Sequence, residues 1–210
     1  RKKLIADTFF SLYDTYVLDR ETTEPFGLLS LRLKFYDFMT GFLPDKIIFD
    51  TSENANYFVK KYYVNSKKVF ILPVSAKPGV FKAMDKKEFR EKVIGFYGSF
   101  IPLHGVSTIL DIAKKIGDPD ISFLLMGTGH ELPKIRKEIN NSQLLKNKIK
   151  LIEDFVKYKD LPKFYQNIDL FLGGPFGITP KAKRVLPAKV VEALSMGIPT
   201  IVIQTPATLR

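Results

Sequence analysis

The residues of this chain that are best suited to chemistry lie in one stretch, residues 181–202. Lys189 and Glu192 stand three positions apart on a predicted helix, so both side chains project from one face near its first turn. A carboxylate can accept hydrogen bonds from two neighbouring hydroxyl groups, and cations suit phosphate oxygens. Further cations precede the helix, namely Lys181, Lys183 and Arg184. This pattern predicts a ligand with both hydroxyls and phosphates, as in a nucleotide sugar.

The helix that carries this pair has recognisable ends and a second face. Pro187 favours its start and Gly197 its end. Val190, Ala193 and Leu194 form the second face, which we expect to pack on a sheet. The alternative interpretation of the Lys–Glu pair is a surface ion pair, worth about 0.2–0.5 kcal/mol.

A glycine turn near residue 98 is a second candidate for chemistry. A strand is predicted at 93–97, and a helix at 105–116 follows the turn. Backbone N–H groups at a helix start attract anions, and a glycine lets a diphosphate approach the backbone closely. An ordinary strand–helix turn is the alternative. The candidates for diphosphate contact in this turn are Gly98, Ser99, His104 and Gly105.

Loops after other predicted strands add candidates for a base pocket and neighbouring contacts. These residues are Gly127, Glu153, Asp154, Phe155 and Thr179. For the acidic pair the alternative is a solvated turn. For the glycine-rich loop before Thr179 the alternative is a flexible loop without ligand contact.

The elements that position these residues form a regular series from residue 92 onward. Strands are predicted at 93–97, 121–126, 149–152, 168–172 and 200–203. Helices alternate with them, which predicts an open, doubly wound parallel sheet. Such sheets bind ligands at the carboxyl ends of their strands. The candidate residues all follow predicted strands.

Residues 1–91 alternate in a similar way. Strands are predicted at 4–10, 46–50 and 68–73, and helices at 27–40 and 53–62. Residues 74–91 break the pattern with Pro78-Gly79 and a charged run at 85–91, which predicts a linker or hinge. We therefore divide the chain into residues 1–80, a linker to about residue 91, and residues 92–210.

The predicted helix at 27–40 is unusually apolar. Its apolar residues are Leu28, Leu29, Leu31, Leu33, Phe35, Tyr36 and Phe38. Arg32 and Lys34 add positive charge. The helix is too short to span a bilayer. Burial within its domain is the simpler interpretation, and a position in a membrane interface is the alternative.

Composition narrows the classes of function. The 210 residues include no cysteine, which excludes disulfides, thiolate nucleophiles and Cys-ligated metals and favours a reducing compartment such as the cytoplasm. No signal peptide and no run of 18 apolar residues is visible. The formal charge of +11 is spread over both halves and favours anionic partners, which are phosphorylated ligands, an anionic membrane surface or nucleic acid.

Metal and nucleic-acid functions have little support in the sequence. His104 and His130 are too far apart to form a local ligand pair, and a turn explains Asp118-Pro-Asp120 better than a metal site does. The aromatic residues fall mainly in predicted strands and helices and form no stacking platform. We expect no metal, no cofactor and no nucleic-acid partner.

The second half resembles the C-terminal domain of the family-4 retaining glycosyltransferases, which have the GT-B fold. The similarity covers residues 92–205 and rests on three segments in order. These are Gly98-Ser-Phe-Ile-Pro-Leu-His-Gly105, Phe123-Leu-Leu-Met-Gly-Thr-Gly129 and Pro187-Ala-Lys-Val-Val-Glu-Ala-Leu-Ser-Met-Gly-Ile-Pro199. Residues 1–91 resemble the closing part of that family's N-terminal domain. The resemblance implies an α/β fold of GT-B type with two Rossmann-like sheets, both incomplete in this chain.

The resemblance also implies a function. It is the transfer of a hexosyl unit, with retention and without metal, from a nucleotide diphosphate sugar to a glycan or lipid-linked acceptor. Glu192 matches the carboxylate that holds the donor ribose, and Gly98 matches the glycine beside the diphosphate. The catalytic residue is expected upstream of residue 1, so this chain alone would be inactive. The corresponding location is the cytoplasm, with peripheral association at the inner face of the membrane.

Two parts of the family pattern are missing. Arg184 stands where the first glutamate of the E-x7-E pair contacts the donor sugar. Ser99 and His104 stand where an arginine and a lysine often hold the diphosphate. We interpret Arg184, with Lys189 or Lys181, as the replacement positive charge. The missing glutamate also leaves open a non-catalytic nucleotide-sugar or phospholigand-binding module.

Overall fold

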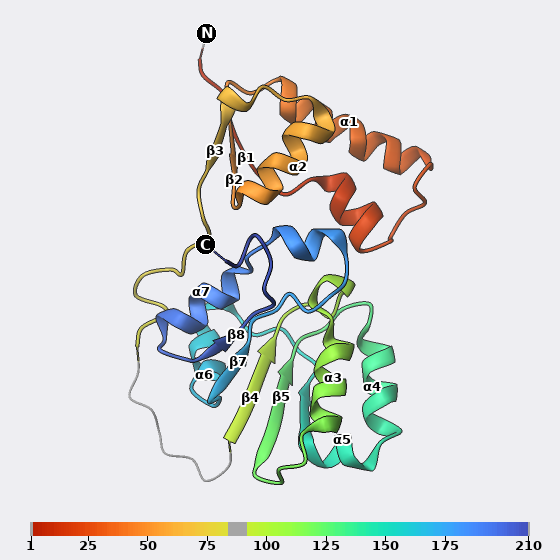
Figure 1. Cartoon of the computed structure of the whole chain (residues 1–210), viewed down its shortest axis with the longest axis vertical. Coiled ribbons are helices and arrows are strands. Elements are labelled where there is room, and N and C mark those ends of the chain that lie inside the picture. Colours follow the sequence, from red (N-terminus) through yellow and green to blue (C-terminus); the bar gives the residue numbers. More distant parts are fainter. Residues whose placement is uncertain (1, 84–91, 210) are drawn as a thin grey trace. The chain divides into compact units, whose positions relative to one another are not determined.

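The chain folds into two compact α/β units. A computed structural model describes residues 2–83 and 92–209 (Figure 1). Unit 1 comprises Arg1–Val74, Thr179–Leu186 and Gln204–Arg210, and unit 2 comprises Ser75–Ile178 and Pro187–Ile203. Two segments late in the sequence thus pack with the first unit, unlike the contiguous division that we expected. The charged run at 85–91 lies outside the described residues. The linker boundary stays a prediction.

Unit 2 contains a five-stranded parallel sheet in the order β6-β5-β4-β7-β8. The strands are β4 (Lys92–Tyr97), β5 (Ile121–Met126), β6 (Ile149–Ile152), β7 (Leu170–Leu172) and β8 (Thr200–Ile201). All five were predicted from the alternating pattern. The strand order reverses between β4 and β7, and ligands of doubly wound sheets bind outside the carboxyl ends at such a reversal.

Helices cover both faces of this sheet. They are α3 (Val106–Lys115), α4 (Leu132–Asn140), α5 (Gln143–Lys148), α6 (Leu161–Tyr165) and α7 (Ala188–Ser195), with 3₁₀ turns at Pro102–His104 and Tyr158–Asp160. Figure 1 shows α3, α4 and α5 on one side of the sheet and α6 and α7 on the other. The buried stripe of α3, with Val106, Ile109 and Leu110, packs in the core as its periodicity predicts. The short polar helix α5 was not predicted.

Unit 1 contains a three-stranded parallel sheet in the order β1-β2-β3. Its strands are β1 (Ile5–Phe9), β2 (Lys46–Phe49) and β3 (Val69–Ile71), and its helices are α1 (Leu28–Phe42) and α2 (Ser52–Tyr62). The predicted strands and helices of this half are therefore present. The short helices at Asp14–Asp19, Ser66–Lys68 and Pro180–Arg184 were not predicted. No described helix is long and apolar enough to cross a membrane.

A buried carboxylate, Asp37 of α1, organises the polar contacts of unit 1. Its oxygens accept hydrogen bonds from the Ser11 hydroxyl at 2.6 Å, the Tyr62 hydroxyl at 2.8 Å, and the backbone N–H groups of Leu12 and Tyr13 at 2.8 and 2.9 Å. These donors belong to the segment after β1 and to α2. The carboxylate therefore joins three parts of the unit, and its burial is tolerated because donors surround it.

The substitution Asp37→Asn tests this role. The amide carries no charge, and its NH₂ group would face N–H donors. We expect the free energy of unfolding to fall by about 2–4 kcal/mol, as for a buried hydrogen-bonded charge. Urea denaturation measures the change. The exposed Glu24 provides the matched control, since Glu24→Gln should alter stability by less than about 0.5 kcal/mol. Equal effects of the two substitutions would contradict the role of Asp37.

Candidate functional site

Three of the candidate residues converge at the carboxyl end of β4. Gly98 follows Tyr97, the last residue of this strand, with φ +149°, a backbone conformation that favours glycine. A Cβ atom at Gly98 would lie 2.8 Å from Lys189 Nζ and 3.1 Å from His104 Cε1. The fold therefore brings Lys189 and His104 to the same glycine, at the reversal of strand order where a ligand is expected.

The ammonium group of Lys189 is held in a nearly dry environment. Its side chain lies over the Phe96 ring, with Nζ 4.3 Å from the ring centre, and Nζ donates a hydrogen bond to the Tyr97 carbonyl oxygen at 3.1 Å. Burial lowers the pKa of Lys189 to about 7, and the charge of Glu192 opposes this shift. An ammonium has three N–H donors, so one engaged with Tyr97 leaves capacity for an anion.

Glu192 is buried beside the same strand. The Tyr97 hydroxyl donates to its Oε2 at 2.5 Å. The Tyr165 hydroxyl lies 3.4 Å from Oε2 and donates to the Lys189 carbonyl oxygen at 3.0 Å. Burial and the neighbouring carboxylate raise the pKa of Tyr97, so its hydroxyl stays protonated and remains a donor. A carboxylate has about four acceptor positions, which leaves room for ligand hydroxyls.

The orientation of α7 differs from the one we expected. Val190 and Ala193 are buried, as predicted, but Leu194 is 57% exposed. Lys189 and Glu192 are buried at 6% and 3% exposure, so the surface-ion-pair interpretation is wrong. The polar face of α7 is buried because the hydroxyls of Tyr97 and Tyr165 lie against Glu192, and the Tyr165 hydroxyl also donates to the Lys189 carbonyl oxygen. The residue pattern along α7 carries no information about these two tyrosines.

Tyr97 and Tyr165 are functional candidates that sequence reasoning missed. The position of Tyr97 at the end of a predicted strand was a signal, since residues there face the ligand edge of the sheet. Tyr165 had no such signal, because its approach to Glu192 depends on how α6 packs. Its ring contacts Tyr97 and Phe171 edge-on, at centroid distances of 5.8 and 5.2 Å.

The other glycines of the predicted site bring backbone segments together. Gly127 follows β5 with φ +146°, and a Cβ atom there would lie 1.9 Å from the Gly98 carbonyl oxygen. Gly105 precedes α3, and a Cβ atom there would lie 2.4 Å from the carbonyl carbon of Phe176. Within this turn, His104 Nδ1 hydrogen-bonds the Ser99 carbonyl oxygen. These contacts fix the shape of the turn. Direct contact of these residues with a ligand stays a prediction.

The loop after β6 has the features of a solvated turn. Glu153 accepts a hydrogen bond from Arg136 Nε at 2.8 Å, and the guanidinium lowers the pKa of this exposed carboxyl. Asp154 accepts from the N–H of Phe155 at 2.7 Å, and the Phe155 ring is exposed. A role for this loop in a base pocket stays a prediction.

The cations before α7 have partners within unit 1. Arg184 Nη2 donates to the two carboxylate oxygens of buried Asp14 at 2.7 Å each, which are charge-assisted contacts, and its Nη1 donates to the Pro180 carbonyl oxygen at 3.0 Å. The guanidinium carbon also lies 4.1 Å from the centre of the Tyr57 ring. The interpretation of Arg184 as a replacement phosphate ligand gains no support, since its charge is already neutralised.

Lys181 and Thr179 are engaged in the same unit. Lys181 Nζ donates to the Thr15 hydroxyl at 2.6 Å, and burial lowers the pKa of this lysine. The Thr179 hydroxyl donates to Asp19 at 2.9 Å. Burial raises the pKa of Asp19. The contacts of residues 179–186 therefore explain why this segment belongs to unit 1.

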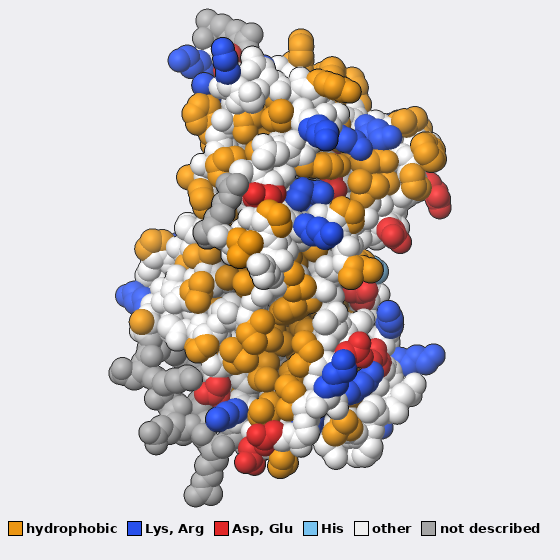
Figure 2. Space-filling view, viewed as in Figure 1, with side chains coloured by type: hydrophobic (Ala, Val, Ile, Leu, Met, Phe, Trp, Pro, Cys, Tyr) orange, Lys and Arg blue, Asp and Glu red, His pale blue; other side chains and the backbone are white. Residues whose placement is uncertain are grey.

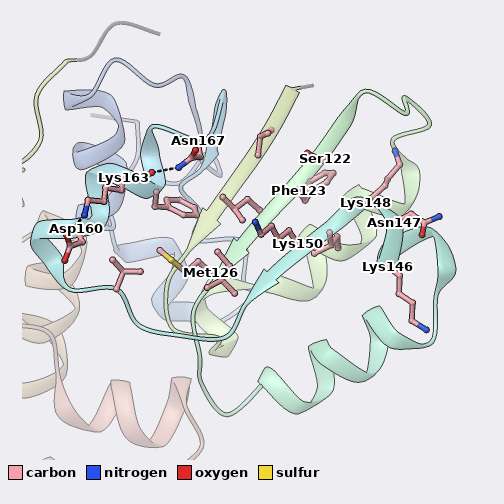
Figure 3. Close-up of a pocket in the computed structure, with 16 residues that line it drawn as sticks. Ser122, Phe123, Met126, Lys146, Asn147, Lys148, Lys150, Asp160, Lys163 and Asn167 are labelled. Atoms are coloured by element: carbon pink, nitrogen blue, oxygen red, sulfur yellow. Dashed lines mark hydrogen bonds and ion pairs between the residues drawn. The ribbon is translucent and has the colours of Figure 1, made fainter. Parts of the chain in front are cut away.

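A separate groove with a volume of about 890 Å³ lies over β5 and β6 (Figure 3). None of the candidate site residues lines it. Several polar groups at its rim bind neighbouring parts of the chain. Lys163 pairs with Asp160 at 3.1 Å, and Lys148 donates to the Asp118 carbonyl oxygen at 2.9 Å. Among the described residues, no group of three His, Asp or Glu side chains is placed to hold a metal ion. Metal independence stays a prediction.

Solved structures with the same fold are glycosyltransferases of GT-B type. Anabaena HepE in complex with UDP-glucose superposes with a TM-score of 0.70 at 14% identity, covering 100% of this chain and 55% of HepE. S. aureus TarM in complex with UDP gives 0.64 at 16% identity, covering 87% and 35%. WaaG, described as a glycosyltransferase of lipopolysaccharide biosynthesis, gives 0.57 at 16% identity, covering 75% and 44%. The predicted fold class is confirmed, and this chain spans about a third to a half of these relatives.

The family follows from the sequence match. Residues 81–209 match the family model described as glycosyl transferases group 1, so the chain belongs to this family. A search of the curated proteins found no significant match. Glycosyl transfer is thus the function of the family. The family match does not specify the donor, the acceptor or the stereochemistry.

The pKa of Lys189 predicts how stability depends on pH. Between its value of about 7 in the folded protein and the ordinary 10.5, the unfolded chain binds a proton that the folded chain has released. Stability should therefore rise with pH across this window, relative to a Lys189→Met variant, by on the order of 3–5 kcal/mol in total. Urea denaturation of both proteins at a series of pH values measures the difference. A constant difference would contradict the buried, titrating ammonium.

The ion pair of Arg184 gives a second prediction. Arg184→Ala leaves the Asp14 carboxylate buried without its cation, so we expect a loss of about 3–5 kcal/mol in the free energy of unfolding. We expect the affinity for UDP, measured by calorimetry on the folded variant, to stay unchanged. Asp14→Asn is the matched variant, since it breaks the pair but keeps the guanidinium. A loss of UDP affinity in Arg184→Ala, but not in Asp14→Asn, would restore the phosphate role.

Proposed function

We propose that unit 2 binds the nucleotide diphosphate sugar that serves as donor in glycosyl transfer. The observation that carries this proposal is the buried pair Lys189 and Glu192, which lies beside Gly98 at the carboxyl end of β4. A buried carboxylate with spare acceptor capacity suits the vicinal hydroxyls of a ribose. A buried ammonium beside a glycine backbone that carries no side chain suits the diphosphate.

The same residues account for the chemistry of the leaving group. As the bond from the sugar to the diphosphate breaks, negative charge grows on the diphosphate oxygens. In a dry site, an ammonium already in place stabilises this charge more than water does. Lys189 would supply that cation, and the start of α3 would add the partial positive charge of a helix N-terminus. This mechanism requires no metal.

The finer assignment follows the family resemblance. We propose a hexosyl unit as the transferred group, retention at the anomeric carbon, and a glycan or lipid-linked molecule as acceptor. HepE is described in complex with UDP-glucose and TarM in complex with UDP, which supports a uridine nucleotide as the first donor to test. We propose a cytoplasmic location, where such donors occur.

A second candidate is a non-catalytic module that binds a nucleotide sugar or another phospholigand. The observation that favours it is Arg184, which stands in place of a sugar-binding glutamate and pairs with Asp14. This module would bind the donor at the same residues but would transfer nothing. Release of UDP from UDP-glucose in the presence of candidate acceptors separates the two functions.

The substitution Glu192→Gln tests the donor site. The amide keeps the shape of the side chain but loses the charge that strengthens its hydrogen bonds to ribose hydroxyls. Such bonds contribute about 1.5–3 kcal/mol, so we expect UDP affinity to fall roughly 10- to 150-fold. Calorimetric titration with UDP-, GDP- and ADP-sugars measures the loss and identifies the base.

The matched control is Glu153→Gln, the same change at an exposed carboxylate. It should leave UDP affinity within about twofold, because surface pairs contribute little. An unrelated oligonucleotide serves as the second ligand. Binding of the oligonucleotide in place of all nucleotide sugars would reject the proposal. So would equal losses in the two variants.

A further inference from the structure

Glu192 differs from an ordinary surface carboxylate in the partners that it has. Exposed Glu153, for example, pairs with Arg136. Figure 2 shows acidic side chains beside Lys and Arg side chains on the surface of unit 2. Glu192 is instead 3% exposed, and the hydroxyls of Tyr97 and Tyr165 lie against it. Neutral donors hold a carboxylate without cancelling its charge, so that charge remains for a ligand.

Tyr97 contacts both candidate residues of α7. Its hydroxyl donates to Glu192 Oε2 at 2.5 Å, and its backbone carbonyl oxygen accepts from Lys189 Nζ at 3.1 Å. One residue at the end of β4 therefore fixes the carboxylate and the ammonium relative to the sheet. Because the short contact ends at Oε2, Oε1 is the oxygen that can face the hydroxyls of a ligand.

Ring packing holds the Tyr97 hydroxyl in place. The Tyr97 ring has Phe164, Tyr165 and Phe171 around it, at centroid distances of 5.9, 5.8 and 6.0 Å. The Tyr165 side chain is 1% exposed, and its hydroxyl donates to the Lys189 carbonyl oxygen at 3.0 Å, which ties α7 to α6. A side chain enclosed by rings has few alternative rotamers, so the hydroxyl is already directed at the carboxylate before a ligand binds.

A purely structural role is the simpler explanation of the bond to Glu192, since any buried carboxylate needs donors. Two features indicate more than that. Tyr97 is the last residue of β4, at the edge of the sheet where ligands bind. It also holds the ammonium of Lys189, which lies beside Gly98. The residue therefore joins the two groups that would contact different parts of one ligand.

We propose that Tyr97 is a positioning residue for the recognition of ribose, an inference that rests on the proposed donor site. Its hydroxyl would hold Glu192 so that Oε1 accepts from the vicinal hydroxyls of the ribose. Its carbonyl oxygen would hold Lys189 beside the diphosphate. The preference of the site for ribonucleotides over nucleotides without these hydroxyls therefore depends on the Tyr97 hydroxyl.

The substitution Tyr97→Phe removes this hydroxyl and keeps the ring and the carbonyl group. Calorimetry on the whole chain measures the affinity for UDP and for 2′,3′-dideoxyuridine diphosphate, which lacks both ribose hydroxyls. We expect Tyr97→Phe to weaken UDP binding about three- to tenfold, and to change the affinity for the dideoxy compound by less than about twofold. The ratio of the two affinities reports the positioning role, because a general disturbance of the site would weaken both ligands equally.

A double-mutant cycle shows whether Tyr97 acts through the carboxylate. In a Glu192→Gln background, Tyr97→Phe should change UDP affinity by less than about twofold, because the carboxylate that Tyr97 positions is absent. A loss as large as in the wild-type background would mean that Tyr97 contacts the ligand itself, and it would overturn the positioning role.

Tyr57→Phe is the matched control. The Tyr57 hydroxyl is buried in unit 1 and has no hydrogen-bond partner among the described residues, so both affinities should stay unchanged. Tyr165→Phe is a second variant that tests the proposal even if Tyr97→Phe does not fold. It removes the longer contact to Oε2, so we expect the affinity ratio to fall about two- to threefold. An unchanged ratio in this variant would count against the proposal.

The outcomes separate this inference from the donor site itself. Absence of UDP binding by the wild-type protein would reject the donor site and the inference with it. Equal wild-type affinity for the two ligands would reject the ribose contact of Glu192, and the inference again with it. Tight binding of UDP with the same affinity ratio in the wild type and in Tyr97→Phe would reject the positioning role alone and leave the donor site intact.

Discussion

The burial of Glu192 is the constraint on which the arrangement of unit 2 depends. A carboxylate removed from water must find donors, and here the hydroxyls of Tyr97 and Tyr165 lie against it. Because one tyrosine ends β4 and the other lies on α6, the carboxylate fixes α7 against both the sheet and a neighbouring helix. That position also places Lys189 beside Gly98. The candidate site is therefore a consequence of how one buried charge is accommodated.

Much of the fold could be predicted because its signals are local. Strands and helices alternate along the chain, and the carboxyl ends of parallel strands meet at one edge, so the convergence of Gly98 and Lys189 followed from topology. The rotation of α7 could not be predicted, since Glu192 is buried against Tyr97 and Tyr165 while Leu194 is exposed, and neither tyrosine belongs to α7. Tertiary partners decide which face of a short helix turns inward.

The partners of the charged residues before α7 could not be predicted from the sequence either. The sequence is equally consistent with Arg184 and its neighbours as phosphate ligands and as members of ion pairs, because a phosphate and a carboxylate both offer anionic oxygens to a cation. Asp14, the carboxylate that decides the matter, lies 170 positions away in the sequence. The same pairing explains why a division of the chain into contiguous domains missed residues 179–186, since the contacts that hold them connect distant parts of the chain.

Helix α1 extends this reasoning from single residues to a whole surface. An apolar stripe indicates that one side of a helix is distinct, and the usual inference is that this side faces the core. In α1 the opposite holds, because Asp37 has four donors on the inner side and would lose them all if the helix turned. Leaving apolar side chains in water costs less for each residue than burying a carboxylate without partners. The hydrogen bonds of Asp37 therefore hold the helix in the orientation that the structure shows.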